Sequence, residues 1–163
     1  REYLQPENKE NIIGVQGQLW SETIKGDQML EYYYLPKIIG LAETAWSERE
    51  WETIADREER EKAMGKAWNI FTNTLAKKEL PRLNSIFGGY NYRIPLPGAV
   101  IKNGLLQANV EFPGLDLRYT TDGSEPTLES SLFTVPVEVS GTVKIRAFDA
   151  AGNSSRTSMI KAE

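Results

Sequence analysis

The spacing of hydrophobic residues in this chain changes abruptly at Pro95-Leu96-Pro97-Gly98. Before this segment the spacing is mostly helical, and after it hydrophobic and polar residues alternate as in strands. All four tryptophans and most of the charged residues lie before this segment. Short alternating stretches and turn dipeptides follow it. A Pro- and Gly-rich break between two such patterns is typical of a domain boundary. We therefore predict two domains, 1–94 and 95–163.

The first domain opens with an apolar run, Ile12-Ile13-Gly14-Val15, that leads to Leu19-Trp20-Ser21-Glu22. A nearly continuous apolar run indicates a strand, near 11–19, from a parallel sheet covered on both faces. From Asp27 the pattern becomes helical, and Pro36 marks either a kink or the first turn of a new helix. The apolar positions of this helix are Ile38, Leu41, Ala42, Ala45 and Trp46.

A second helical stretch is predicted over 56–77 and continues through Pro81-Arg82-Leu83 to a stop at Gly88-Gly89. Its expected buried stripe consists of Ala63, Ala67, Ile70, Phe71 and Leu75. Trp46, Trp51 and Trp68 lie on or beside helical stripes, which favours a role in helix packing. A strand followed by helices is typical of an α/β unit.

The second domain has alternating segments at 105–111, 115–121, 142–148 and 155–161. Asp122-Gly123 and the turn-rich stretch 149–153 separate them, which predicts a small antiparallel sandwich. Asp116, Asp122 and Glu125 are an alternative calcium site, because hard cations prefer oxygen ligands, but Asp-Gly favours a turn. We therefore expect no metal and no cofactor.

Composition excludes several classes of function. A net charge of -4 and a pI near 5.1 argue against binding to nucleic acid or to an anionic membrane surface. The chain has no cysteine and no histidine, which removes thiolate sites and every imidazole-dependent triad. No segment is long and apolar enough to predict insertion into a membrane.

The pair Trp20 and Glu22 is the best candidate for a binding site. On a strand these two side chains point to the same face, about 7 Å apart. A flat apolar ring beside an anionic acceptor suits a pyranose, which has one apolar face and hydroxyls at its edge. The alternative is that Trp20 belongs to the hydrophobic core.

Several motifs, in order, resemble the last β/α unit of a family 20 β-N-acetylhexosaminidase barrel and the immunoglobulin-like module that follows it in chitobiases. The barrel motifs are Gly17-Gln18-Leu19-Trp20-Ser21-Glu22, Leu30-Glu31-Tyr32-Tyr33-Tyr34-Leu35-Pro36-Lys37, and Gly40-Leu41-Ala42-Glu43-Thr44-Ala45-Trp46-Ser47. The module's motifs are Tyr119-Thr120-Thr121-Asp122-Gly123-Ser124-Glu125-Pro126-Thr127 and Val143-Lys144-Ile145-Arg146-Ala147-Phe148-Asp149. The implied architecture is an α+β chain: a terminal unit of a (β/α)8 barrel, further helices, and then an antiparallel immunoglobulin-like sandwich.

The resemblance implies that Trp20 forms a wall of the subsite for the terminal N-acetylhexosamine and that Glu22 accepts from its O4 and O6 hydroxyls. In that family the 2-acetamido oxygen of the substrate is the nucleophile, and an adjacent Asp-Glu pair stabilises it and supplies the acid. This chain contains no Asp-Glu dipeptide, so it carries no catalytic residue. We therefore expect the chain by itself to be inactive.

The partner implied by the family is a glycan ending in N-acetylhexosamine, and the implied location is secreted, periplasmic or on the surface of a bacterium. A different class of function stays open, in which the sandwich is a non-catalytic carbohydrate-binding or spacer module. A strand cut from its sheet exposes its edges, so we also expect the segment near 11–19 to be disordered, to repack or to associate with a second copy.

Overall fold

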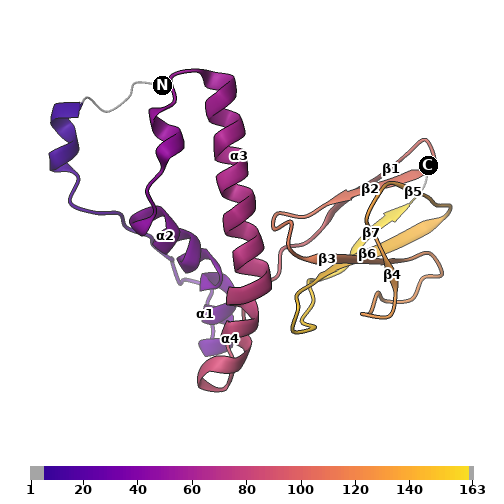
Figure 1. Ribbon diagram of the computed structural model, residues 1–163. Coiled ribbons are helices and arrows are strands. Elements are labelled where there is room, and N and C mark those ends of the chain that lie inside the picture. The colour runs from indigo at the N-terminus through magenta and orange to yellow at the C-terminus, as the bar shows by residue number, and fades with distance from the viewer. Residues whose placement is uncertain (1–5, 162–163) are drawn as a thin grey trace.

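A computed structural model describes residues 6–161, in which a helical part precedes two small antiparallel sheets (Figure 1). The α-helices are α1 (Asp27–Tyr34), α2 (Lys37–Trp46), α3 (Arg57–Thr74) and α4 (Leu80–Ser85). A π-helical turn, Leu75–Glu79, joins α3 to α4. Short 3-10 turns lie at Pro6–Asn11, Glu50–Thr53 and Ile86–Gly88.

Pro36 separates two helices instead of kinking one. It lies immediately before α2, and its peptide bond with Leu35 is cis. Leu35 is extended, with φ -98° and ψ 138°, as expected because a following proline disfavours the helical conformation. Of the two alternatives predicted at this proline, the new helix is the one that the structure shows.

The long helix starts where the sequence predicts. Asp56 is its N-cap, and the carboxylate accepts a hydrogen bond from the backbone N–H of Glu59 at 2.8 Å. The π-helical turn immediately precedes Pro81, whose ring has no N–H to donate and crowds the carbonyl four residues earlier. The predicted buried stripe is partly wrong: Leu75 is buried, whereas Ile70 is 61% exposed.

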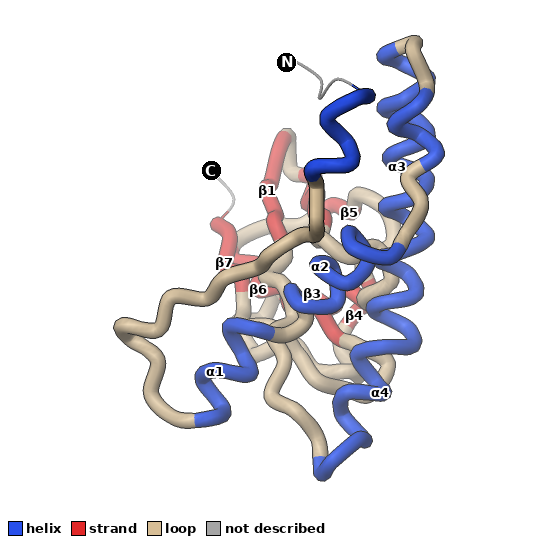
Figure 2. Tube along the Cα trace, turned by 90° about the vertical axis from the view of Figure 1, so that its left-hand side faces the viewer, coloured by secondary structure: helices blue, strands red, loops and turns tan. Residues whose placement is uncertain are grey.

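The predicted strand near 11–19 does not form. Residues 12–20 are in no strand of the described chain and run as an extended loop from the first 3-10 turn to the loop before α1 (Figure 2). Ile13 is fully exposed, and Ile12 and Val15 are more than half exposed. A strand of this type needs a hydrogen-bonded neighbour at each edge, and no described residue supplies one.

The expected burial of α2 is also wrong. None of its residues is buried, and Trp46 is 88% exposed. A groove of about 300 Å³ separates Ala42 and Trp46 of α2 from Phe71 and Thr74 of α3. An amphipathic stripe is buried only where another element covers it, and α3 covers α2 only in part.

The two sheets have the strand orders β1-β2-β5 and β4-β3-β6-β7, and every pairing is antiparallel. The structure confirms the four predicted strands and adds three. The predicted ones are β2 (Leu105–Asn109), β3 (Asp116–Thr120), β6 (Thr142–Phe148) and β7 (Ser158–Lys161). The added ones are β1 (Gly98–Lys102), β4 (Ser131–Leu132) and β5 (Val137–Glu138), of which the last two are too short for a periodic signal.

The helices and the second sheet share one hydrophobic core. Leu80, which is fully buried, belongs to the same cluster as Leu75, Phe112, Leu117 and Ile145. Gly114 allows this close approach, because a Cβ there would lie 2.8 Å from the Cβ of Ala76. The cluster takes residues from both sides of 94/95, and the boundary at that position stays a prediction.

The Asp122-Gly123 pair forms a turn, as the sequence favours. Asp122 accepts hydrogen bonds from the backbone N–H of Ser124 at 2.9 Å and from its hydroxyl at 2.6 Å. Gly123 has a φ of 86°, a conformation that glycine adopts without strain. Within 6–161, no helix has the length and hydrophobicity that a membrane span requires.

Candidate functional site

Trp20 and Glu22 lie in the irregular segment between the first 3-10 turn and α1. Trp20 is 75% exposed in this chain, and Glu22 is exposed as well. Glu22 begins a turn in which the N–H of Ile24 bonds to the carbonyl of Ser21 at 3.2 Å. The alternation of a strand, on which their common direction was predicted, is therefore missing here.

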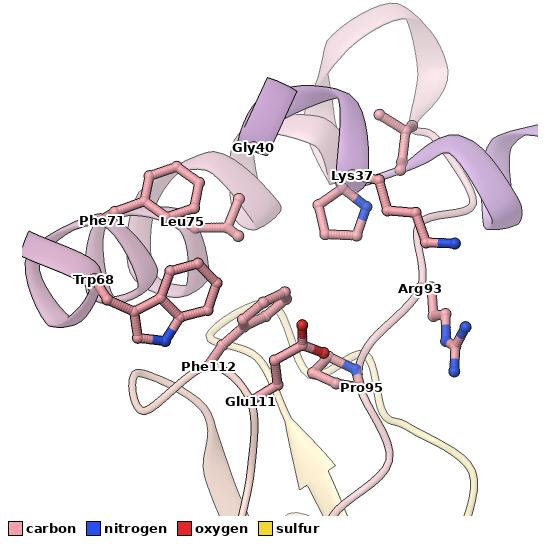
Figure 3. A pocket seen from close by; sticks show the side chains of 11 residues that line it. Lys37, Gly40, Trp68, Phe71, Leu75, Arg93, Pro95, Glu111 and Phe112 are labelled. Carbon is pink, nitrogen blue, oxygen red and sulfur yellow. The ribbon is translucent and has the colours of Figure 1, made fainter. Parts of the chain in front are cut away.

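An apolar cavity of about 210 Å³ lies where the helices meet the sandwich (Figure 3). Trp68 and Phe71 of α3 form one side together with Leu75 of the π-helical turn, and Phe112, in the loop after β2, lies below them. Lys37 and Arg93 lie at the opposite side, and Glu111 lies beside Phe112. The cavity therefore combines an aromatic wall with three charged groups.

Sequence reasoning did not identify this cavity, because its residues come from four segments far apart in the chain. Neither Trp20 nor Glu22 lines it, and neither lines the groove between α2 and α3. The one sequence feature that could have indicated this cavity is Arg93, a charged residue within the otherwise uncharged segment from Asn91 to Pro95. Its backbone N–H bonds to the carbonyl of Leu35 at 3.1 Å, which places it beside the start of α2.

A polar network fixes the segment before β1 against the turn after β6. Tyr92 donates a hydrogen bond to the carboxylate of Asp149, and both residues are buried. The amide of Asn153 donates to the Tyr92 oxygen at 2.7 Å and to Asn84 at 3.1 Å. Burial, and then the Asp149 carboxylate, raise the pKa of Tyr92 well above its usual range.

The alternative calcium site is not assembled in the described part of the chain, where no group of three or more acidic side chains is placed to hold a metal ion. Glu125 accepts hydrogen bonds from Thr157 and from Lys144, the latter at 2.8 Å. These bonds, that of Lys144 first, lower the pKa of the Glu125 carboxyl. Its oxygens thus hold the loop before β4 against β6 and the segment before β7.

Comparison with known families divides the chain in two. Residues 1–49 match the glycosyl hydrolase family 20 catalytic domain, and residues 79–157 match the chitobiase/beta-hexosaminidase C-terminal domain. The second match begins at Glu79, in the π-helical turn, and ends at Thr157, so it includes α4 and the strands β1 to β6. Trp20 and Glu22 lie within the first match.

Curated relatives align with almost the whole chain. N,N'-diacetylchitobiase of Vibrio harveyi is 35% identical over 160 residues, which are 92% of this chain and 18% of the relative. A beta-hexosaminidase of Vibrio vulnificus is 33% identical over 181 residues, 96% of this chain and 20% of the relative. A beta-hexosaminidase of Porphyromonas gingivalis is 28% identical over 163 residues.

The chain spans about a fifth of the length of these relatives. The two family matches occur in the order in which the sequence motifs predicted them, a barrel segment and then a sandwich. The chain thus carries a segment of a glycosyl hydrolase family 20 catalytic domain followed by a chitobiase/beta-hexosaminidase C-terminal domain.

Proposed function

We propose that this chain is part of a β-N-acetylhexosaminidase that removes terminal N-acetylhexosamine from glycans by substrate-assisted, retaining hydrolysis. Its contribution is one wall of the sugar subsite, with Trp20 as the platform and Glu22 as the hydroxyl acceptor. The observation that supports this best is that both residues lie within the match to the glycosyl hydrolase family 20 catalytic domain. A Trp that is 75% exposed offers the apolar face that a pyranose needs.

In the complete catalytic domain, neighbouring strands would pair with both edges of the segment near 11–19. Pairing would restore the alternation that brings Trp20 and Glu22 to one face, about 7 Å apart. The same neighbours would cover Ile12, Ile13 and Val15, which are exposed in the chain by itself. We infer that subsite and strand form together.

The chain alone supplies residues that bind the sugar but none that cleave the glycosidic bond. It has no Asp-Glu dipeptide to orient the acetamido group and protonate the leaving oxygen. A Trp face and one charged acceptor contribute roughly 1 and 2 kcal/mol, whereas even millimolar affinity requires about 4 kcal/mol. The isolated chain should therefore neither hydrolyse glycosides nor bind N-acetylglucosamine more tightly than millimolar.

The test is Glu22→Ala in a protein that carries the complete catalytic domain. Loss of a charge-assisted hydrogen bond of roughly 1.5–3 kcal/mol should lower kcat/KM for a chromogenic N-acetylglucosaminide by about one to two decades. Glu48→Ala is the matched control, since Glu48 is exposed and lies in the same family match. Equal kcat/KM values for Glu22→Ala and the parent would refute the role of Glu22.

The loose apolar segment also supports a proposal about the isolated chain: it associates with a second copy through residues 12–20. Three aliphatic side chains and Trp20 are exposed there within nine residues. An unpaired extended segment with such side chains is a template for pairing with another chain.

A spacer role for the sandwich is the second candidate function. Phe112 and Phe148 are buried, so they offer no exposed aromatic platform for a glycan.

A further inference from the structure

A second cavity, which we call the polar cavity, lies where α1, the segment before β1 and the loop between β6 and β7 meet. Its volume is about 260 Å³, far more than a single water requires. Tyr32, Tyr90 and Tyr92 line it from the helical side, and Arg146 and Arg156 line it from the sandwich side. Its other lining residues are mostly amide and hydroxyl side chains.

The charge of the polar cavity is unbalanced. No carboxylate lines it, and within residues 6–161 no ion pair involves Arg146 or Arg156. Arg146 uses its Nε to donate to the carbonyl of Ser155 at 2.9 Å, which leaves its two Nη groups without a hydrogen bond to the described residues. Two guanidinium groups thus face one cavity in a chain whose net charge is -4.

A third cation, Arg118, lies next to Arg146 because of the strand register. Arg118 of β3 lies directly opposite Arg146 of β6, so both side chains leave the same face of the sheet. Like charges at such a position destabilise a sheet unless something neutralises them. Arg118 has Asp116 at 3.5 Å, whereas Arg146 makes no ion pair in the described chain, and the carboxylate that interacts with it electrostatically, Glu125, is already paired with Lys144 at 2.8 Å.

The two carboxylates that contact lining residues accept hydrogen bonds from neutral groups. Asp149 accepts from Tyr92 and from the backbone N–H groups of Ala151 and Asn153, both at 2.9 Å. Glu31 accepts from the backbone N–H of Asn91 at 2.8 Å. Neither carboxylate is placed against a guanidinium group within ion-pair distance.

The helical side of the polar cavity has the features of a saccharide platform. Tyr32 and Tyr90 present rings, and Asn153 offers an amide that Tyr92 and Asn84 hold in place. Phe87, which is 92% exposed, extends this aromatic surface, with its ring centroid 6.5 Å from that of Tyr90. Rings that cover an apolar sugar face, beside amide and hydroxyl partners for its edge, suit a pyranose.

We propose that the polar cavity binds an acidic sugar residue, one that carries a carboxylate or a sulfate. Arg146 and Arg156 take the oxyanion, for which guanidinium groups have the matching geometry. The tyrosines and Asn153 take the ring and its hydroxyls. This site is separate from Trp20 and Glu22 and does not depend on the proposed hydrolytic function.

The test is a calorimetric or NMR titration of the 163-residue chain at low ionic strength with glucuronic acid, N-acetylglucosamine 6-sulfate, glucose and sodium sulfate. We expect at least one acidic sugar to bind at least tenfold more tightly than glucose and than sulfate. The two acidic sugars distinguish a carboxylate site from a sulfate site. Sulfate binding equal to that of both acidic sugars, or no binding of either, would overturn the proposal.

Variants locate the binding. Arg156→Gln should weaken the acidic sugar at least tenfold, and Arg156→Lys should recover part of that loss, since lysine keeps the charge without the planar fork. The Arg156 side chain is exposed and donates no hydrogen bond to the described residues, and the Arg156 carbonyl, which accepts from the Ser155 hydroxyl at 2.7 Å, is unchanged by the substitution, so the variant should fold. Lys102→Gln in β1 removes the same charge elsewhere on the sandwich. Equal effects of Arg156→Gln and Lys102→Gln would contradict the assignment.

Discussion

The phenol of Tyr92 donates a hydrogen bond to the carboxylate of Asp149 across 57 positions of sequence. Tyr92 lies in the segment between α4 and β1, and Asp149 follows β6 directly. The bond therefore connects the end of the helical part to a turn of the second sheet. Both residues are buried, so each depends on this hydrogen bond more than an exposed group would.

Tyr92→Phe should lower the free energy of unfolding by about 1–3 kcal/mol, because it leaves a buried carboxylate oxygen without its donor. Urea denaturation at neutral pH measures this loss. Tyr34→Phe is the matched control, since Tyr34 is 40% exposed and its hydroxyl makes no hydrogen bond to the described residues. Equal unfolding midpoints for the two variants would show that the Tyr92 hydrogen bond adds nothing to stability.

Stability should also fall in strong base. The pKa of Tyr92 is raised in the folded chain, by burial and then by Asp149, above its ordinary value of 10.0. A raised pKa means that the folded state holds the proton more tightly, so this contribution is complete below about pH 10 and is lost as the pH rises further. The difference in unfolding free energy between parent and Tyr92→Phe should therefore shrink above pH 10. A difference that is constant from pH 7 to 11 would contradict this.

Gly114→Ala should destabilise the chain by about 1–3 kcal/mol, because the new methyl would press against the Cβ of Ala76 at 2.8 Å and the Cα of Asn73 at 3.2 Å. Gly65→Ala tests the same substitution in open space, since nothing lies within 4 Å of its Cβ position in α3. There alanine should stabilise by roughly 0.5–1 kcal/mol, as is usual inside a helix. Thermal unfolding of the two variants should therefore shift in opposite directions.

The isolated chain should associate with itself as its concentration rises. Sedimentation or light scattering should show an increasing average mass, and Ile13→Asp should reduce that increase, because a charge on the extended segment opposes pairing. Val135→Asp, at an apolar side chain that is 66% exposed in the sandwich, is the control. A parent chain that stays monomeric at all concentrations would disprove this route of association.

Features that depend on neighbouring residues were predicted well. The long helix begins at Asp56 and Asp122 forms its turn as predicted, and at Pro36 the structure shows one of the two predicted alternatives, because each feature depends on contacts within a few positions of sequence. The four longest alternating segments gave β2, β3, β6 and β7, because alternation needs only one buried face. The family motifs likewise predicted the order of the two domain matches.

Features that depend on residues far apart in the sequence were not predicted. The apolar run near 11–19 has the composition of a strand, yet it forms none, because no strand of the described chain pairs with it. The apolar stripe of α2 is not buried for a similar reason: a helix face is buried only when another element packs against it. The two cavities between the helices and the sandwich also unite residues from separate segments.

Sequence alone predicted the start of the long helix, the Asp122-Gly123 turn and the Trp20–Glu22 candidate, since each rests on local chemistry. Tertiary structure determined that Tyr92 meets Asp149, that the helices share a core with β3 and β6, and that Arg146 and Arg156 face one cavity. The physical reason is that hydrogen bonding, burial and charge balance are properties of groups in contact. Contacts across tens of residues follow from how the elements pack, which no local pattern encodes.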